Sequence, residues 1–218
     1  MKPLILINFK TYQEAIGNKG IILAEKLSKV RNKDYEIAIA PSALLLKTIA
    51  DKVKIKVYSQ HADPISSGAH TGSISLDELK LMGVEGTLLN HSEKKIPFDE
   101  LKQTVELCRK KGLKVIVCAS NLAEVRKTAE LKPDFLAYEP KELIGGEVSV
   151  TKARPEIILE AVKLVKELSR NTKVICGAGV HSKEDIGQAL LLGTKGVLIG
   201  HSVPKAKNPE RFLKEMLI

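Results

Sequence analysis

The sequence is poor in the residues on which several protein classes depend. It has no tryptophan, four phenylalanines and four tyrosines among 218 residues, so it lacks the aromatic stacking surfaces that single-stranded nucleic acids use. Its three cysteines, Cys108, Cys118 and Cys176, are widely spaced and form no C-x-x-C pair. This argues against a disulfide framework and against a structural zinc site. No apolar run approaches the roughly 20 residues that span a bilayer.

The net charge and the N-terminal residues exclude further classes of protein. The formal net charge is +9, but the lysines are spread over predicted helices and do not form a cluster, so we expect a solvated basic surface and no nucleic-acid partner. Attraction of a small anionic substrate is a further possibility. The stretch Met1-Lys2-Pro3 leads directly into an apolar run and is too short for a signal peptide. We therefore expect a cytoplasmic protein without a membrane anchor.

Strand and helix patterns alternate eight times along the chain. Short apolar runs typical of buried parallel strands occur at Leu4–Phe9, Tyr35–Ala40, Lys56–His61, Gly86–Asn90, Lys114–Cys118, Asp134–Tyr138, Lys173–Cys176 and Gly196–Ile199. Helical spacing or helix-capping signals follow at Gly20–Val30, Ala43–Lys52, Ser75–Met82, Asp99–Lys111, Asn121–Leu131, Pro155–Ser169, Ser182–Leu192 and Pro209–Leu217. Ser42 is predicted to cap the second helix, and Ser182 with Asp185 to form a capping box.

This alternation predicts the fold class. Strands that alternate with helices pair in parallel through right-handed crossovers, and eight such units close most naturally as a (β/α)8 barrel. We therefore predict an α/β protein with one barrel domain over residues 1–218. An open doubly wound sheet is the alternative, but the first strand leads into Asn8-Phe9-Lys10 and not into a glycine-rich dinucleotide fingerprint.

Polar residues follow several of the predicted strands, where barrels of this kind carry their active sites. The ends of the first, fourth and sixth strands supply Asn8 and Lys10, His91, and Glu139. Glycine-bearing turns after the seventh and eighth strands match the usual phosphate site of such barrels. A carboxylate, an imidazole and an ammonium group beside a phosphate site suit proton abstraction next to a carbonyl on a phosphorylated substrate.

Taken singly, each of these residues has an ordinary interpretation. Lys10 could be a surface lysine, His91 a helix cap, and Glu139 the polar end of a strand before a proline. Only their joint placement at one end of the predicted barrel favours a catalytic site.

The strand-end segments resemble those of a known family. Asn8-Phe9-Lys10, Asn90-His91-Ser92-Glu93 and Ala137-Tyr138-Glu139-Pro140 resemble three signature segments of triosephosphate isomerases, in the same order. The segment Gly68-Ala69-His70-Thr71-Gly72 resembles the family loop that reaches a partner subunit. Further segments, Gly145-Gly146, Cys176-Gly177-Ala178-Gly179-Val180 and Gly196-Val197-Leu198-Ile199-Gly200, resemble its phosphate loops.

The resemblance implies an activity and a role for each residue. It implies interconversion of dihydroxyacetone phosphate and glyceraldehyde 3-phosphate through an enediolate, in glycolysis and gluconeogenesis, without a cofactor or a metal ion. Glu139 would move the proton, His91 would polarise the carbonyl as a neutral imidazole, and Lys10 would stabilise negative charge. Residues 140–147 would form a lid. The implied substrate-binding residues are Asn8, Lys10, Ile144, Gly145, Gly177, Ala178, Gly179, Gly200 and His201.

The chain also departs from the common family pattern. It is shorter than most members and resembles the compact archaeal branch, whose members are typically tetramers, so we expect a homotetramer, with a homodimer as the alternative. His201 stands where a second glycine is usual. Cys176 is expected to be a packing residue and not a nucleophile.

Other functions fit the residues less well. A Schiff-base aldolase on the same fold needs a lysine at the end of a middle strand, whereas the sixth strand leads to Glu139. A barrel that only binds or scaffolds has no need of the base, the imidazole and the lysine together. The five histidines show no metal-ligand spacing, and His61-Ala62-Asp63 is an isolated candidate.

Overall fold

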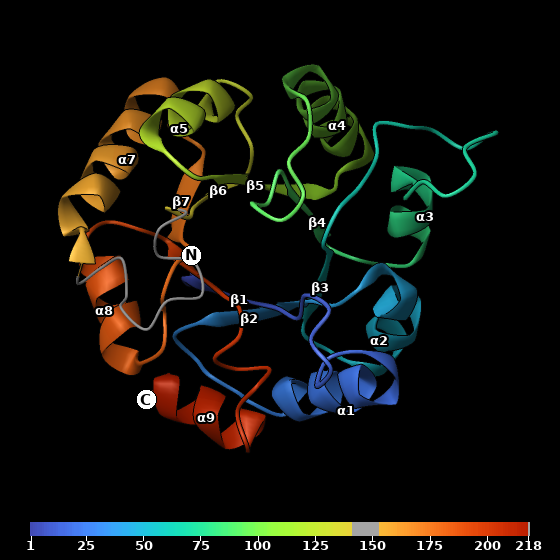
Figure 1. Ribbon diagram of the computed structural model, residues 1–218, viewed down its shortest axis with the longest axis horizontal. Helices are drawn as coiled ribbons and strands as arrows, with labels where there is room; N and C mark the ends of the chain where they lie inside the picture. Colours follow the sequence, from blue (N-terminus) through green and yellow to red (C-terminus); the bar gives the residue numbers. More distant parts are fainter. Residues whose placement is uncertain (141–152, 218) are drawn as a thin grey trace.

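The computed structural model describes residues 1–140 and 153–217. Eight parallel strands in these residues form a closed barrel in sequence order, and β8 pairs with β1 to complete it (Figure 1). The predicted barrel fold is confirmed. The strands are β1 (Leu4–Asn8), β2 (Glu36–Ala40), β3 (Lys56–Ser59), β4 (Gly86–Leu89), β5 (Lys114–Ala119), β6 (Phe135–Tyr138), β7 (Lys173–Cys176) and β8 (Gly196–Ile199).

Helices surround the barrel and follow the strands along the chain (Figure 1). They are α1 (Gly17–Ser28), the 3-10 turn η1 (Ala43–Leu45), α2 (Leu46–Lys52), α3 (Leu76–Leu81), α4 (Phe98–Lys111), α5 (Leu122–Ala129), α7 (Pro155–Leu168), α8 (Lys183–Leu191) and α9 (Pro209–Met216). None of the described helices is long and apolar enough to cross a membrane.

Local signals explain most of the helix ends. The side chain of Ser182 accepts from the backbone N–H of Asp185, whose side chain accepts in return, so the predicted capping box is present. Helix α4 ends at Gly112, which has a φ of 71° that glycine adopts without strain. The predicted Ser42 cap is wrong. Its side chain makes no capping hydrogen bond, because the segment opens as the tight turn η1 before α2 begins.

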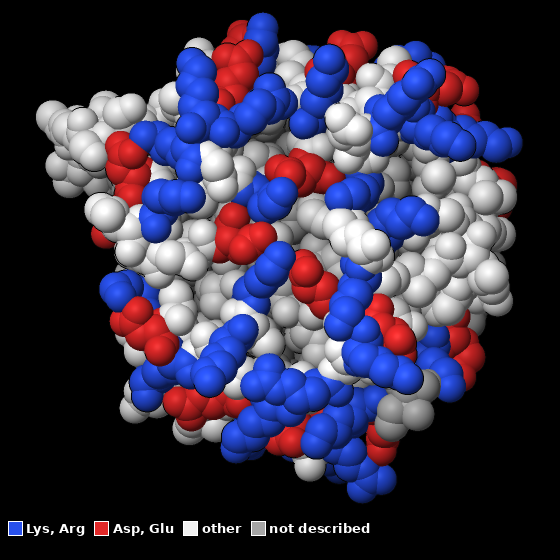
Figure 2. All heavy atoms as spheres, turned by 180° about the vertical axis from the view of Figure 1, so that it is seen from behind, with Lys and Arg blue, Asp and Glu red and all other residues white. Residues whose placement is uncertain are grey.

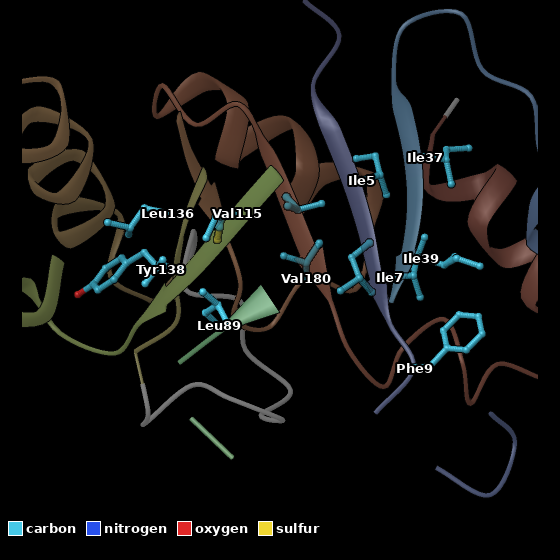
Figure 3. Packing of buried hydrophobic residues seen from close by; sticks show 14 of the residues in the cluster. Ile5, Ile7, Phe9, Ile37, Ile39, Leu89, Val115, Leu136, Tyr138 and Val180 are labelled. Atoms are coloured by element: carbon cyan, nitrogen blue, oxygen red, sulfur yellow. The ribbon is translucent and has the colours of Figure 1, made fainter. Parts of the chain in front are cut away.

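Alternating side chains along the strands build two apolar layers. In β1, Leu4 and Leu6 point into the barrel. Ile5 and Ile7 pack outward against the helices (Figure 3). The interior layer consists of Leu4, Leu6, Ala38, Ala40, Tyr58, Leu88, Ile116, Cys118, Phe135, Ala137, Ile175 and Leu198. Each fully buried aliphatic side chain contributes roughly 1.5–3 kcal/mol, so both layers hold the strands in one register.

The same alternation carries polar side chains into one mouth of the barrel. Ala137 points inward, and the backbone N–H of Glu139 still bonds to the carbonyl of Ala119 at 2.8 Å, so Glu139 continues on the inward side. Gly177 likewise follows the inward Ile175, and its N–H bonds to the carbonyl of Tyr138 at 3.0 Å. The strand period therefore sets which residues reach the mouth.

Charged side chains of both signs cover the outside of the molecule. On the face turned away from the viewer in Figure 1, Lys and Arg lie interspersed with Asp and Glu (Figure 2). Several of these charges are paired, for example Lys56 with Glu36 at 3.2 Å and with Glu85 at 3.0 Å. Exposed pairs of this kind each contribute little stability.

Candidate active site

A pocket lies at the mouth to which these strands point. It gathers residues from the ends of β1, β4, β6, β7 and β8. Its lining is Asn8, Lys10, His91, Glu139, Gly177, Gly179, Val180, His181, Leu198, Gly200, His201 and Ser202. The structure thus brings together most of the predicted site residues. Ala178 is an exception, because it is buried in the outer apolar layer, and Ile144 and Gly145 lie outside the described residues.

Glu139 presents a buried carboxylate to this pocket. The residue is only 3% exposed, and its Oε2 has no hydrogen-bond partner among the described residues. A buried carboxylate oxygen without a partner is costly, so its retention points to an atom that is reserved for a ligand or a proton. The same oxygen lies 3.6 Å from Nε2 of His91. A base and a ring nitrogen can therefore act on neighbouring atoms of one small molecule.

The backbone fixes the tautomer of His91. Nδ1 of the ring accepts the backbone N–H of Glu93 at 3.2 Å, which requires a lone pair on Nδ1. The proton of a neutral ring then sits on Nε2, the nitrogen that faces Glu139. This N–H comes from the turn that follows His91. The ring is placed by Asn90, whose left-handed φ of 58° redirects the chain after β4.

Lys10 is held in a strained conformation at the end of β1. Its φ is 47°, in the left-handed region that non-glycine residues rarely adopt, at a cost of about 1–3 kcal/mol. Its backbone N–H bonds to Oδ1 of Asn8 at 3.0 Å, and the side-chain amide of Gln60 bonds to its carbonyl at 3.1 Å. The amide of Gln60 also reaches the carbonyl of Ala40 at 2.9 Å. These contacts, from β1, from β2 and from the residue after β3, hold the strained backbone of Lys10 in place.

The ammonium group of Lys10 is charged at neutral pH. Its Nζ lies 2.6 Å from Oε1 of Glu93. Burial alone would lower the pKa of Lys10, but the hydrogen bond and the negative charge of Glu93 outweigh it and hold the pKa above its usual value. Because the Glu93 side chain is 57% exposed, a bound anion can compete with it for the lysine.

Gly177 leaves room for the base. A Cβ at this position would lie 2.3 Å from Cγ and 2.9 Å from Cδ of Glu139. Real Cβ contacts are not that short, so only glycine fits beside Glu139 in this arrangement. The glycine that the sequence predicted as part of a phosphate loop therefore also determines where the carboxylate sits.

The cysteines near the pocket are not nucleophiles. Cys176 and Cys118 are both buried, and burial raises the pKa of Cys176 to about 12. The pKa of Cys118 is raised well above its usual value, by burial first and then by the charge of Glu139. A thiol that stays protonated is inert, and this agrees with the packing role expected for Cys176.

Sequence reasoning missed some residues of the site. His181 lines the pocket, and Gln60, directly after β3, supports Lys10. His181 could have been found from its position directly after the glycine turn of residues 177–180. Gln60 carries no comparable signal, because its role arises from contacts between three strands that only the closed barrel creates.

The chain is similar throughout to proteins of one family. A model of the family described as "Triosephosphate isomerase" matches residues 3–216. The triosephosphate isomerase of Methanocaldococcus jannaschii is 43% identical over 215 residues, 98% of both chains. That of Methanothermus fervidus is 39% identical over 218 residues, 99% of this chain and 98% of its own. That of Archaeoglobus fulgidus is 40% identical over 215 residues, 98% of this chain and 96% of its own. The chain belongs to the triosephosphate isomerase family.

Membership of the triosephosphate isomerase family defines the reaction. Enzymes of this family interconvert dihydroxyacetone phosphate and glyceraldehyde 3-phosphate in glycolysis, and this chain is an isomerase of that kind. The pocket is consistent with a triosephosphate isomerase, because a carboxylate, an imidazole and an ammonium group face one small volume that glycine turns border.

Proposed function

We propose that Glu139 is the base of the isomerisation, that His91 polarises the substrate carbonyl, and that Lys10 stabilises the developing negative charge. One observation carries this proposal. Oε2 of Glu139 has no hydrogen-bond partner among the described residues and lies 3.6 Å from Nε2 of His91. The proton of a neutral His91 ring faces the same atoms, because Nδ1 accepts the N–H of Glu93. A proton acceptor and a hydrogen-bond donor thus flank one position.

The proton transfer then balances in two steps. Oε2 of Glu139 takes a proton from the carbon next to the carbonyl, the C–H electron pair becomes the C=C bond, and the carbonyl π pair moves to oxygen. The resulting enediolate oxygen accepts hydrogen bonds from His91 Nε2–H and from the ammonium group of Lys10, which stabilise its charge. The proton that Glu139 holds returns to the neighbouring carbon, while the hydroxyl proton shifts between the two oxygens.

The rest of the pocket is suited to the phosphate. Gly177, Gly179 and Gly200 line the same pocket as the reacting groups, and backbone N–H groups at glycine turns bind anions well. We include Ala178, His201, Ile144 and Gly145 in the substrate site because of the family resemblance, and a lid over residues 140–147 for the same reason. Excluding water would strengthen the electrostatic interactions in the pocket.

The same proposal extends to the assembly and the setting of the enzyme. We propose one barrel domain over residues 1–218 that forms a homotetramer, with a homodimer as the alternative, and that works in the cytoplasm in glycolysis and gluconeogenesis without a cofactor or nucleic-acid partner. Three large apolar side chains, Leu44, Leu81 and Leu191, are at least 80% exposed, which supports association through part of this surface. Light scattering coupled to gel filtration would measure the mass, and a monomer at micromolar concentration would contradict the assembly.

Deuterium incorporation tests the role of Glu139. In D₂O the carboxyl group exchanges with solvent, so wild type should place deuterium on the carbon that receives the proton, and Glu139→Gln should not. Glu160→Gln, a matched change on an exposed residue of α7, is the control and should behave as wild type. Incorporation by Glu139→Gln at the wild-type rate, followed by NMR, would show that another group is the base.

A further inference from the structure

Two histidines line the pocket without a part in the proton transfer. The rings of His181 and His201 lie 5.1 Å apart between centroids and are tilted by 59°. Both line the same pocket as Lys10 and Glu139. His181 follows the glycine turn after β7, and His201 follows Gly200 after β8. The isomerisation steps proposed above use neither ring, so their presence on the phosphate side of the pocket calls for a separate role.

Hydrogen bonds connect the two turns that carry these rings. The hydroxyl of Ser202 donates to the carbonyl of Val180 at 3.0 Å and so joins the turn after β8 to the turn after β7. The backbone N–H of His181 bonds to Oδ2 of Asp185 at 2.9 Å, which fixes the residue to the start of α8. These bonds fix the two turns from which the rings of His181 and His201 project.

Three basic side chains, His181, Lys10 and Lys205, act electrostatically on His201. His181 approaches it from the β7 turn, Lys10 from the end of β1, and Lys205 from the segment before α9. Lys205 Nζ lies 4.5 Å from the ring centroid of Tyr12, and Lys10 Nζ lies 6.0 Å from the same centroid, so both ammonium groups are near this ring. Burial lowers the pKa of His201, and the charges of His181, Lys205 and Lys10 lower it further.

Negative groups around the pair complete the electrostatic setting. The carboxylate of Asp185 accepts backbone N–H groups of His181 and Ser182, and Glu139 lies in the same pocket beside His91. Within residues 1–140 and 153–217, neither carboxylate forms a hydrogen bond or an ion pair with the His201 ring. A dianion that enters the pocket would therefore be the charge that reverses the repulsion among His181, His201 and the lysines.

We propose that His181 and His201 form a proton-linked anion subsite, so that binding of the substrate's phosphate dianion is accompanied by uptake of a proton from solvent onto a ring nitrogen of this pair. The proposal rests on the proposed function, because it assigns the pair to the phosphate of the same substrate. Protonation adds an N–H donor and a positive charge next to the phosphate, and charge-assisted hydrogen bonds of this kind are the strong ones. The proton returns to solvent when the phosphate leaves.

Proton linkage predicts a pH dependence of anion affinity with a definite sign. Uptake of a proton on binding means that affinity rises as the pH falls, by at most tenfold per pH unit for each proton. For one shared proton taken up over part of the range, we expect sulfate to bind roughly fivefold more tightly at pH 6 than at pH 8. Sulfate is the suitable probe because it stays a dianion over this range, whereas phosphate itself titrates near pH 6.

The experiment counts the protons that the protein takes up when sulfate binds. Titration calorimetry of the full chain with sodium sulfate at pH 6.5, in two buffers of different ionisation enthalpy, gives the number of protons taken up. We compare wild type with the double variant His181→Asn, His201→Asn, which keeps polar side chains of similar size but cannot titrate. His70→Asn removes an exposed histidine that lines none of these turns and is the control. Circular dichroism and thermal melting confirm that each variant is folded.

Each outcome has one meaning. Proton uptake in wild type and in the His70 variant, with loss in the double variant, supports the subsite. Equal uptake in the double variant, no uptake in wild type, or no sulfate binding by wild type overturns it. Isomerase assays on the same preparations separate the two proposals. An active wild type that takes up no proton refutes only the subsite, whereas proton-linked sulfate binding without isomerase activity refutes the catalytic roles and leaves the subsite standing.

Discussion

Gly177→Ala is the substitution for which the structure makes the sharpest quantitative prediction. The added Cβ would lie 2.3 Å from Cγ, 2.9 Å from Cδ and 3.0 Å from Oε1 of Glu139. Carbon atoms pack comfortably at about 3.5–4.0 Å, so the Glu139 side chain has to move by roughly 1 Å or more. The change adds a single methyl group and alters no charge, which makes it a test of position alone.

The size of the effect follows from that displacement. Misplacement of a reacting group by about 1 Å can reduce a rate by roughly 100-fold, so we expect kcat to fall by about that factor. Crowding the site also costs stability, typically about 1–3 kcal/mol. The corresponding loss in Tm is roughly 2–4 °C for each kcal/mol in a protein of this size. The protein should thus remain folded while it loses most of its activity.

The assay compares Gly177→Ala with a matched control in the same steady-state experiment. Gly187→Ala, in the interior of α8, places a Cβ with no heavy atom within 4 Å. It should keep the wild-type kcat and gain up to about 1 kcal/mol of stability, as expected for alanine in a helix. A Gly177→Ala enzyme with a kcat within twofold of wild type would refute the claim that this glycine positions the carboxylate.

Two further predictions concern the support of the site and its thiols. Gln60→Ala should lower kcat and destabilise the fold by about 1–3 kcal/mol, because it removes partly buried hydrogen bonds that hold the strained backbone of Lys10. An unchanged melting temperature and kcat would contradict this. Burial raises the pKa of Cys108 and of Cys176 to about 12, and that of Cys118 also lies well above its usual value. A disulfide reagent at pH 8 should therefore label no thiol in the folded protein and three per chain in denaturant, and rapid labelling of the native protein would show that the thiols are accessible.

The sequence predicted the fold well because the barrel repeats simple local signals. Runs such as Lys173–Cys176 and Gly196–Ile199 have the observed strand bounds, since apolar strands buried on both faces stand out between polar loops. The catalytic candidates could be predicted for the same reason. A residue such as Glu139 that directly follows a strand must lie at the barrel mouth once the strands are parallel.

The features that sequence reasoning missed depend on contacts between distant segments. Lys10 and Asn90 adopt left-handed backbone conformations although neither is a glycine. Hydrogen bonds from the surrounding strand ends stabilise these conformations. Gln60 joins the site only through the closure of the barrel, whereas the position of His181 after the glycine turn could have indicated it. Ser42 failed as a cap because a local preference gave way to the 3-10 turn that packs before α2.

The central claim is that Glu139 carries out the proton transfer between dihydroxyacetone phosphate and glyceraldehyde 3-phosphate. The most direct measurement is the conversion of glyceraldehyde 3-phosphate by purified wild type beside Glu139→Gln prepared identically, with sulfate binding measured on both. We predict fast turnover by wild type, loss of most turnover in the variant, and similar sulfate affinity. Comparable turnover by the two folded proteins would contradict the assignment of the base.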